Sequence, residues 1–519
     1  MSLMFAAVIA GVAGLIALAY EILWYRVFSF VNKGSPMTFG LLLGFYLLGV
    51  ALGSLVSRAY CRRKEATFDR TQLRNLAGFV FFAQLVAWSV IPLLGWCANH
   101  GSWTLALAPV ALSALLLGAA LPLVAHFGIA PDDRAGARLS YVYLANIVGS
   151  AAGSLVVGYI LVDVWPLQKV ALAIAMMGFC LVAGLLRAAR VRAWLAWGGL
   201  VATAVATYAT NPRALDRIWE KLQFKHELSI DFRFAEIVEN KSGVITVTPS
   251  GEVYGGGAYD GIFNAGLRYD RNGIFRTYTL GAMRPAYHEA LMIGLASGSW
   301  AQVVVNMPEL RKLTIVEINP GYLEVIGKRP EAAWLLTDPR IEIVVDDGRR
   351  WLQRHPEGRF DLVVMNTTWH WRAHITNLLS REYMELVRAH LAPSGVFFFN
   401  TTHSEDAMKT SLTVFGFGLR VYNCMAVSDA PLAVDKEHWR ALLGGFRIQG
   451  EPVLDLSQEL DRARFAELVS YADTVNEPPA REGLESKESM LPRFSSARVI
   501  TDDNMVPEWR DPLTVQIAR

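Results

Sequence analysis

The sequence predicts a chain of two parts: an α-helical multi-span membrane domain, then an α/β Rossmann-like domain with a small β-subdomain at its amino end. Two observations predict this class. Long apolar segments fill the first 210 residues, and most are long enough to cross a bilayer. After residue 288, apolar runs typical of buried strands alternate with helical stretches, which is the pattern of a parallel sheet with crossover helices.

Composition separates the two parts and excludes some partners. The 519 residues are 53% hydrophobic, and the excess lies in the first 210, whereas the remainder has the balance of a globular domain. The net charge is only +2, so we expect no nucleic-acid partner. The four cysteines show neither a disulfide framework nor the spacing of metal ligands, so we expect no metal.

The apolar region is predicted to contain about seven transmembrane helices, with the lipid bilayer as its partner. The loops after the second, fourth and sixth segments are the arginine-rich ones, which predicts a cytoplasmic amino terminus. Seven spans would place the rest of the chain outside, whereas a cytosolic substrate favours the inside, so the side of the soluble part stays open. Homo-oligomerisation through the membrane helices is also left open. The segments lie near residues 4–24, 37–57, 75–97, 103–128, 139–163, 167–187 and 193–209.

The pattern along the chain predicts four regions. The membrane domain covers residues 1–210, and a helical linker follows at 211–229. Short alternating segments with glycine-rich turns predict the β-subdomain over 230–285. The Rossmann-like domain, which we expect to bind a nucleoside, covers 286–519.

Two strand ends predict one half of a nucleoside pocket. The first apolar run ends in a turn of small residues, and the second ends about 20 residues later at Glu317. Small residues let a ligand approach the backbone, and a carboxylate at this spacing can bind both hydroxyls of a ribose. The turn residues that we expect to bind the nucleoside are Gly294, Ala296 and Gly298.

A third strand end predicts the other half of the pocket. The apolar run of residues 341–345 ends in Asp346, Asp347 and Gly348. In a doubly wound sheet the three strand ends lie side by side at the carboxyl edge, where ligands bind. An acid at this position, Asp347 above all, can accept a hydrogen bond from an adenine amino group. No lysine follows the glycine turn, so a nucleoside triphosphate fits poorly.

With these motifs in place, the chain resembles the spermidine synthases, or polyamine aminopropyltransferases, and in particular their membrane-fused bacterial relatives. The resemblance covers about residues 230–425 and the multi-span front. It implies a β-subdomain on a methyltransferase-like Rossmann fold in a protein of the bacterial inner membrane. It also implies S-adenosylmethionine or its decarboxylated form as the small-molecule substrate, with no further cofactor.

The sequence departs from the family pattern at two places in the site. The family's nucleoside-binding acids match Glu317 and Asp347, but Ala296 replaces the middle glycine of the turn. The general base of the family acts at the end of the fourth strand, where this chain has Asn366. The run 287–289, Tyr-His-Glu, is similar to a substrate-binding motif of the family but lies too close to the turn to match it.

Asparagine at position 366 changes the predicted chemistry. Its amide does not titrate near neutrality, so it cannot take a proton from an amine nucleophile. We therefore favour a lyase reaction, in which the carboxylate of S-adenosylmethionine attacks its own γ-carbon and releases methylthioadenosine and homoserine lactone. Trp369 and His370 follow Asn366 closely and are catalytic candidates with it, because an aromatic ring can stabilise a sulfonium cation.

Three other functions stay open on the sequence. The first is the aminopropyl transfer that gives the family its name. The second is methyl transfer, since methyltransferases share the fold. The third is a catalytically silent nucleoside sensor coupled to a transport domain, which the departures at Ala296 and Asn366 favour.

Overall fold

The computed structural model describes residues 2–62, 70–366, 369–476 and 483–510. The chain forms two compact units. The first comprises Met1–Phe234 and Glu239–Val244, and the second comprises Ala235–Val238 and Ile245–Ala518. A short segment of the β-subdomain region thus belongs to the first unit, and the chain passes between the units more than once.

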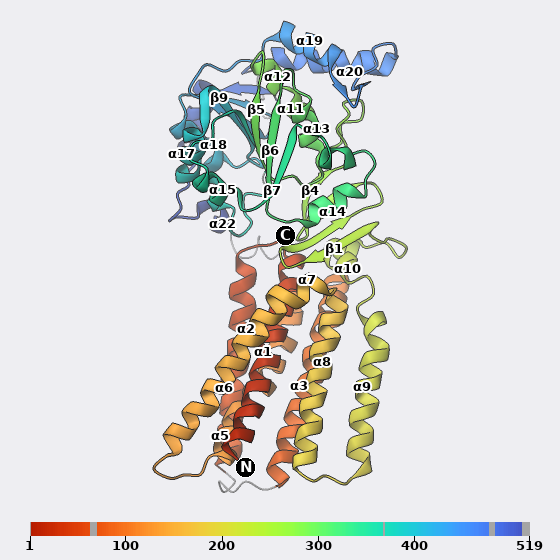
Figure 1. Ribbon diagram of the computed structural model, residues 1–519, viewed down its shortest axis with the longest axis vertical. Coiled ribbons are helices and arrows are strands. Elements are labelled where there is room, and N and C mark those ends of the chain that lie inside the picture. The colour runs from red at the N-terminus through yellow and green to blue at the C-terminus, as the bar shows by residue number, and fades with distance from the viewer. Residues whose placement is uncertain (1, 63–69, 367–368, 477–482, 511–519) are drawn as a thin grey trace. The chain divides into compact units, whose positions relative to one another are not determined.

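The first unit is built from long helices (Figure 1). Their nearly continuous apolar sequences leave few backbone groups or side chains that require water. The helices are α1 (Leu3–Val31), α2 (Met37–Cys61), α3 (Arg70–His100), α4 (Leu107–Gly118), α5 (Ala120–Gly128), α6 (Ala135–Leu155), α7 (Val162–Val164), α8 (Leu167–Ala188), α9 (Trp194–Ala214) and α10 (Ile218–Phe224).

Six helical segments in the described part of the chain are long and apolar enough to cross a membrane. They coincide with the first six predicted spans. The seventh predicted span, at 193–209, forms helix α9 but is not among the six, so its place in a membrane stays a prediction. Helix α9 has the length of a span, but its glycine, threonine and asparagine residues lower its hydropathy. The six are Leu3–Val31, Met37–Cys61, Arg70–His100, Trp103–Gly128, Ala135–Val164 and Leu167–Ala188.

Helices α1 and α6 pack with their backbones in contact. A side chain at Gly149 would overlap the backbone of Gly11, and a side chain at Gly153 would overlap the backbone of Leu15. The Asn146 amide donates to the carbonyl of Ala10 at 3.0 Å across the same interface. Small residues four apart therefore set the distance between these two helices.

Arg26 near the end of α1 explains why residues 239–244 belong to the helical unit. Its guanidinium donates to the carbonyls of Asn240 at 2.8 Å and Gly243 at 3.1 Å. Glu239 accepts hydrogen bonds from the Leu167 backbone at 2.9 Å and the Trp219 indole at 3.0 Å. Burial raises the pKa of Glu239, and Arg26 lowers it.

The second unit contains the large sheet and most of the small sheet (Figure 1). The small antiparallel sheet has the order β1-β2-β3-β4, with β1 (Glu236–Asn240), β2 (Gly243–Val247), β3 (Glu252–Gly255) and β4 (Ala258–Ile262). The large sheet has the order β14-β10-β11-β9-β8-β5-β6-β7. Its strands are β5 (Glu289–Ile293), β6 (Lys312–Glu317), β7 (Ile341–Val345), β8 (Phe360–Met365), β9 (Leu391–Asn400), β10 (Phe417–Val421), β11 (Cys424–Ser428) and β14 (Leu484–Ser486).

The large sheet is doubly wound, as predicted. Strands β5 to β9 are parallel, and β11, β10 and β14 extend the sheet in antiparallel pairs. Alternate residues of β5 enter different cores, with Met292 in one and Leu291 in the other, so both faces are covered. The covering helices include α13 (Ser299–Val305), α14 (Gly321–Gly327), α15 (Gly348–Arg354), α17 (Arg381–Ala389) and α18 (Glu405–Val414).

The strand order fixes the place of the site. From β5 the chain winds outward to β6 and β7, and then returns to place β8 on the other side of β5. Ligands of open α/β sheets bind where the winding reverses, at the carboxyl ends of the strands. In this chain that point lies between β5 and β8, which brings the glycine turn next to Asn366.

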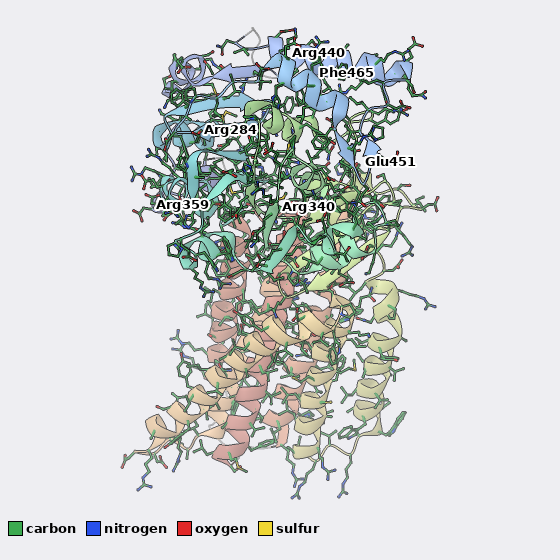
Figure 2. All side chains as sticks on the ribbon, turned by 45° about the horizontal axis from the view of Figure 1, so that its top comes forward. Arg284, Arg340, Arg359, Arg440, Glu451 and Phe465 are labelled. Carbon is green, nitrogen blue, oxygen red and sulfur yellow. The ribbon has the colours of Figure 1, made fainter. Side chains whose placement is uncertain are left out.

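Short elements complete the second unit. Arg440 and Phe465 lie on two helices, α19 and α20, that pack together near the carboxyl-terminal part of the chain (Figure 2). The remaining elements are α11 (Phe275–Tyr278), α12 (Leu280–Met283), α16 (Thr376–Leu379), α19 (Lys436–Gly445), β12 (Arg447–Ile448), β13 (Glu451–Pro452), α20 (Glu459–Ser470), α21 (Lys487–Met490) and α22 (Val506–Trp509).

Candidate functional site

The turn after β5 has the tight geometry that its small residues predict. Gly294 and Gly298 have φ angles of +86° and +74°, which glycine adopts without strain. Ala296 has a φ of +48°, which is unfavourable for alanine, so the surrounding structure must hold it. A side chain at Gly294 would lie 3.5 Å from the carbonyl oxygen of Asn366. The turn and the end of β8 are therefore neighbours at the switch point.

Glu317 at the end of β6 is hydrogen-bonded to the backbone of this turn. Its carboxylate accepts the backbone N–H of Leu295 at 2.7 Å and the backbone N–H of Asn319 at 2.8 Å. The residue is only 3% exposed, so Glu317 is not a solvated acid at a strand end. The backbone N–H of Ala296 is a third donor, and a carboxylate has about four acceptor positions, so some acceptor capacity remains for a ligand.

The environment of Glu317 changes its proton affinity. Burial raises the pKa of this carboxyl to about 7, and the backbone hydrogen bonds from the turn oppose the rise. The nearby Asp260 adds a smaller upward contribution because like charges disfavour a second carboxylate. Glu317 can therefore change its charge near neutral pH, where most carboxylates are fully ionised.

The two acids after β7 have different partners. Asp346 accepts a hydrogen bond from Arg350 Nε at 2.7 Å and lies 3.6 Å from Arg354, and its hydrogen bond with Arg350 is the main cause of its lowered pKa. Asp347 is the N-cap of α15 and accepts the backbone N–H of Arg350 at 2.8 Å. A side chain at Gly348 would lie 2.6 Å from Ile293 in β5, so only glycine fits there. Of these two acids, Asp346 is the one bonded to an arginine side chain, whereas Asp347 is bonded to an arginine backbone N–H.

Asn366 belongs to a chain of amides. Its Oδ1 accepts from Asn400 Nδ2 at 3.1 Å, and Asn400 Oδ1 accepts from Asn423 Nδ2 at 3.2 Å. Asn423 in turn accepts from Arg276, whose guanidinium lies 5.7 Å from the centre of the Trp300 ring. These bonds fix the orientation of Asn366 and put no titrating side chain at the place where the family base acts.

The aromatic segment after β8 packs against the loop that follows β9. His370 makes hydrogen bonds to Thr402 Oγ1 from its backbone N–H at 3.0 Å and from ring Nδ1 at 2.8 Å. Trp369 and Trp371 stack with their ring centres 6.3 Å apart. Trp371 is buried, whereas Trp369 is 37% exposed. Of these three, Trp369 is therefore the ring best able to meet a ligand.

The sequence interpretation missed Asp260 and Tyr322. Tyr322 on α14 donates its hydroxyl to Asp260 on β4, and burial raises the pKa of Tyr322 well above its usual value, so the phenol stays protonated. The feature of the sequence that could have indicated a close approach here is the run of three glycines at 255–257, just before Asp260. A side chain at Gly255 would overlap both Asp260 Oδ2 and Tyr322 Oη.

The run at 287–289 lies at the other edge of the sheet. Tyr287 is buried and donates its hydroxyl to the carbonyl of Leu280 at 2.9 Å. His288 precedes β5 and lies 3.6 Å from Asp361 and 3.4 Å from Glu309. These residues surround the amino end of β5, whereas the glycine turn follows its carboxyl end, so their exclusion from the site agrees with the structure.

Comparisons with known proteins show which family, relatives and solved structures this chain resembles. Residues 279–415 match the family described as the spermine/spermidine synthase domain. The polyamine aminopropyltransferase of Corynebacterium efficiens is 25% identical over 73% of this chain and 73% of its own length. That of Mycobacterium tuberculosis strain H37Rv is 24% identical over 75% of this chain and 76% of its own. A spermidine synthase structure from Thermotoga maritima superposes with a TM-score of 0.33 and 17% identity, over 47% of this chain and 86% of that chain.

The sheet order defines a Rossmann-like domain, preceded in the chain by apolar helices long enough to span a membrane. Residues 279–415 of this domain match the spermine/spermidine synthase domain, and the chain is similar to the polyamine aminopropyltransferases. The resemblance that the sequence predicts is confirmed.

Proposed function

We propose that the second unit binds S-adenosylmethionine or its decarboxylated form and cleaves the sulfonium bond to release methylthioadenosine. The observation that supports this most is the alignment of the glycine turn, Glu317 and Asp347 along one sheet edge at the switch point. Glu317 binds the ribose hydroxyls and Asp347 binds the adenine amino group. The turn lets the sugar approach the backbone.

The reaction that we favour is an intramolecular cleavage of S-adenosylmethionine. A carboxylate oxygen of the substrate attacks its own γ-carbon while the bond from that carbon to sulfur breaks. The bonding pair moves to sulfur, which leaves as the neutral thioether methylthioadenosine, and the other product is homoserine lactone. No proton is transferred, so the reaction needs no base at the position of Asn366.

The protein's part in this reaction is to fold the substrate. Attack of the carboxylate requires a bent conformation in which the reacting atoms are about 3–3.5 Å apart. Asn366, which is hydrogen-bonded to Asn400, and the partly exposed Trp369 both follow β8, and we expect them to contact the methionine part of the substrate. An aromatic face beside a sulfonium stabilises its positive charge.

A second candidate is aminopropyl transfer, as in the relatives named polyamine aminopropyltransferases. This reaction needs a neutral amine and a group that accepts its proton. Asn366 does not provide that group, so a transferase would need another residue as the base.

One experiment separates these reactions. The purified full-length protein is incubated with S-adenosylmethionine alone, and separately with decarboxylated S-adenosylmethionine plus putrescine, and the products are identified by mass spectrometry. Methylthioadenosine from S-adenosylmethionine alone supports the lyase. Spermidine in the second reaction supports the transferase. No product in either, with binding of methylthioadenosine retained, supports a sensor.

A further inference from the structure

Strand β4 lies directly against the glycine turn of the site. The carbonyl of Ile262 in β4 accepts hydrogen bonds from Ser297 Oγ at 3.1 Å and from Ser299 Oγ at 2.7 Å. The backbone N–H of Asn264, just beyond the strand, donates to Ser299 Oγ at 3.1 Å. The small sheet therefore supplies one wall of the region around the turn, and Asp260 lies on this wall.

Asp260 is held in place by a buried phenol. Tyr322 is 8% exposed and lies on the first turn of α14, which follows Glu317 and β6. It donates its hydroxyl to Asp260, and the missing side chain at Gly255 makes room for both groups. A phenol donor fixes the direction of a carboxylate without removing its charge.

Two charged groups near Asp260 come from different parts of the second unit. Glu317 of β6 is near enough for the charge of Asp260 to affect its proton affinity. Arg372, in the segment after β8, interacts with Tyr322, and its Nη2 would lie 2.9 Å from a side chain at Gly256. Asp260 therefore belongs to the same strand-end group as the proposed nucleoside site.

The other acids at this edge of the sheet already have an assigned partner or role. Glu317 and Asp347 are proposed above to bind the ribose and the adenine, and Asp346 is hydrogen-bonded to Arg350. The proposed substrates carry a primary ammonium group, and Asn366 offers no negative charge to bind it. An ammonium group in a partly buried site requires an anionic partner.

We propose that Asp260, oriented by Tyr322, binds the primary ammonium group of the sulfonium substrate. This rests on the proposed function, since it assumes a nucleoside in the site. The ammonium group is the α-amino group in S-adenosylmethionine and the propylamine group in the decarboxylated form. Asp260 thus determines that the site prefers an aminated side chain over a plain thioether.

Binding of three ligands tests the proposal by isothermal titration calorimetry on the full-length protein. Methylthioadenosine has neither ammonium nor sulfonium, S-adenosylhomocysteine has the ammonium only, and S-adenosylmethionine has both. Asp260→Asn should weaken both aminated ligands by about 10- to 100-fold, because a charge-assisted hydrogen bond is lost. Its affinity for methylthioadenosine should stay within about twofold of the unaltered protein.

Two further variants control this result. Tyr322→Phe keeps the charge of Asp260 but not its orientation, so it should weaken the aminated ligands less than Asp260→Asn does. Asp429→Asn removes an exposed acid that pairs with Arg388 at 2.7 Å, and it should change nothing.

Each other outcome overturns the proposal in a distinguishable way. Equal losses for all three ligands would make Asp260 a structural residue. A loss for S-adenosylmethionine alone would assign Asp260 to the sulfonium, and no loss would remove it from the site. If the unaltered protein binds none of the three, the proposed function itself fails.

Discussion

The carboxylate of Glu317 accepts the backbone N–H of Leu295 at 2.7 Å, so the end of β6 holds the turn that follows β5. One side chain thereby links the two strand ends that the sequence predicts to bind a ribose. A ligand that binds this carboxylate would therefore contact a side chain that is also hydrogen-bonded to the turn.

Glu317→Gln should weaken the binding of methylthioadenosine by about 1–3 kcal/mol, the scale of a charge-assisted hydrogen bond in a buried site. The amide keeps the shape but replaces one acceptor oxygen with a donor. Titration calorimetry measures the change. Glu342→Gln, at an exposed acid that pairs with Lys312 at 2.7 Å, is the matched control. Unchanged affinity in Glu317→Gln would refute the ribose assignment.

The binding of methylthioadenosine should depend on pH near neutrality. The pKa of Glu317 is about 7, and ribose hydroxyls favour the ionised carboxylate, so affinity should rise as the pH increases through this value. Stability should change in the opposite direction. The pKa is raised in the folded state, so the contribution of Glu317 is full at low pH and is lost as the pH rises through about 7.

Calorimetry and thermal unfolding across a pH series measure both trends, and Glu317→Gln should flatten them. An affinity that falls between about pH 6 and 8 would contradict a ribose bound by the ionised form.

Asp347 should have two separable roles. Asp347→Ala removes the N-cap of α15, which costs about 1 kcal/mol, and also removes the acid proposed to bind adenine. Asp347→Ser keeps a cap but not the charge. Both variants should lose more affinity for methylthioadenosine than for methylthioinosine, which lacks the amino group. Equal losses for the two ligands would leave Asp347 with the capping role alone.

Asn366→Asp should gain some aminopropyl transfer from decarboxylated S-adenosylmethionine to putrescine. A base at this position is worth about 10²–10⁴-fold in rate if its absence is the only defect. Asn400 can still donate to the new carboxylate, as it donates to Asn366 Oδ1 at 3.1 Å. Spermidine measured by mass spectrometry tests this. Asn423→Asp is the control, because Asn423 belongs to the same series of hydrogen-bonded amides but does not bond to Asn366 directly. No gain in Asn366→Asp would show that more than the base is missing.

The packing of α1 on α6 should be sensitive to the size of residue 149. Gly149→Val would force a side chain into the backbone of Gly11, and overpacking of this kind costs about 1–3 kcal/mol. Gly184→Val is the control, because no atom lies within 4 Å of a side chain there. Thermal unfolding in detergent should show a lower midpoint for Gly149→Val only. Equal midpoints would mean that the two helices separate without cost.

The strand ends were predictable because buried parallel strands are continuous apolar runs in the sequence. The residues that follow each run lie at the carboxyl edge of the sheet, where ligands bind. The turn at Gly294, Glu317 and the pair Asp347-Gly348 lie where the sequence places them. The number of spans was less predictable. Helix α9 has the length of a span but a lower hydropathy, so length alone gave seven.

The contacts between distant segments were not predictable. Asp260 and Tyr322 are 62 residues apart, and no periodicity connects a β-subdomain strand with a helix of the Rossmann domain. The amide chain from Asn366 to Asn423 is equally invisible, because its members lie on separate strands and loops.

The central claim is that this chain cleaves a sulfonium without an external base, and turnover of S-adenosylmethionine alone in oxygen-18 water tests it most directly. We predict methylthioadenosine together with homoserine lactone that carries no oxygen-18, because the attacking oxygen comes from the substrate's own carboxylate. Homoserine with oxygen-18 in its hydroxyl group would instead show attack by water. Absence of methylthioadenosine here, with spermidine formed from decarboxylated S-adenosylmethionine and putrescine, would contradict the claim and establish a transferase.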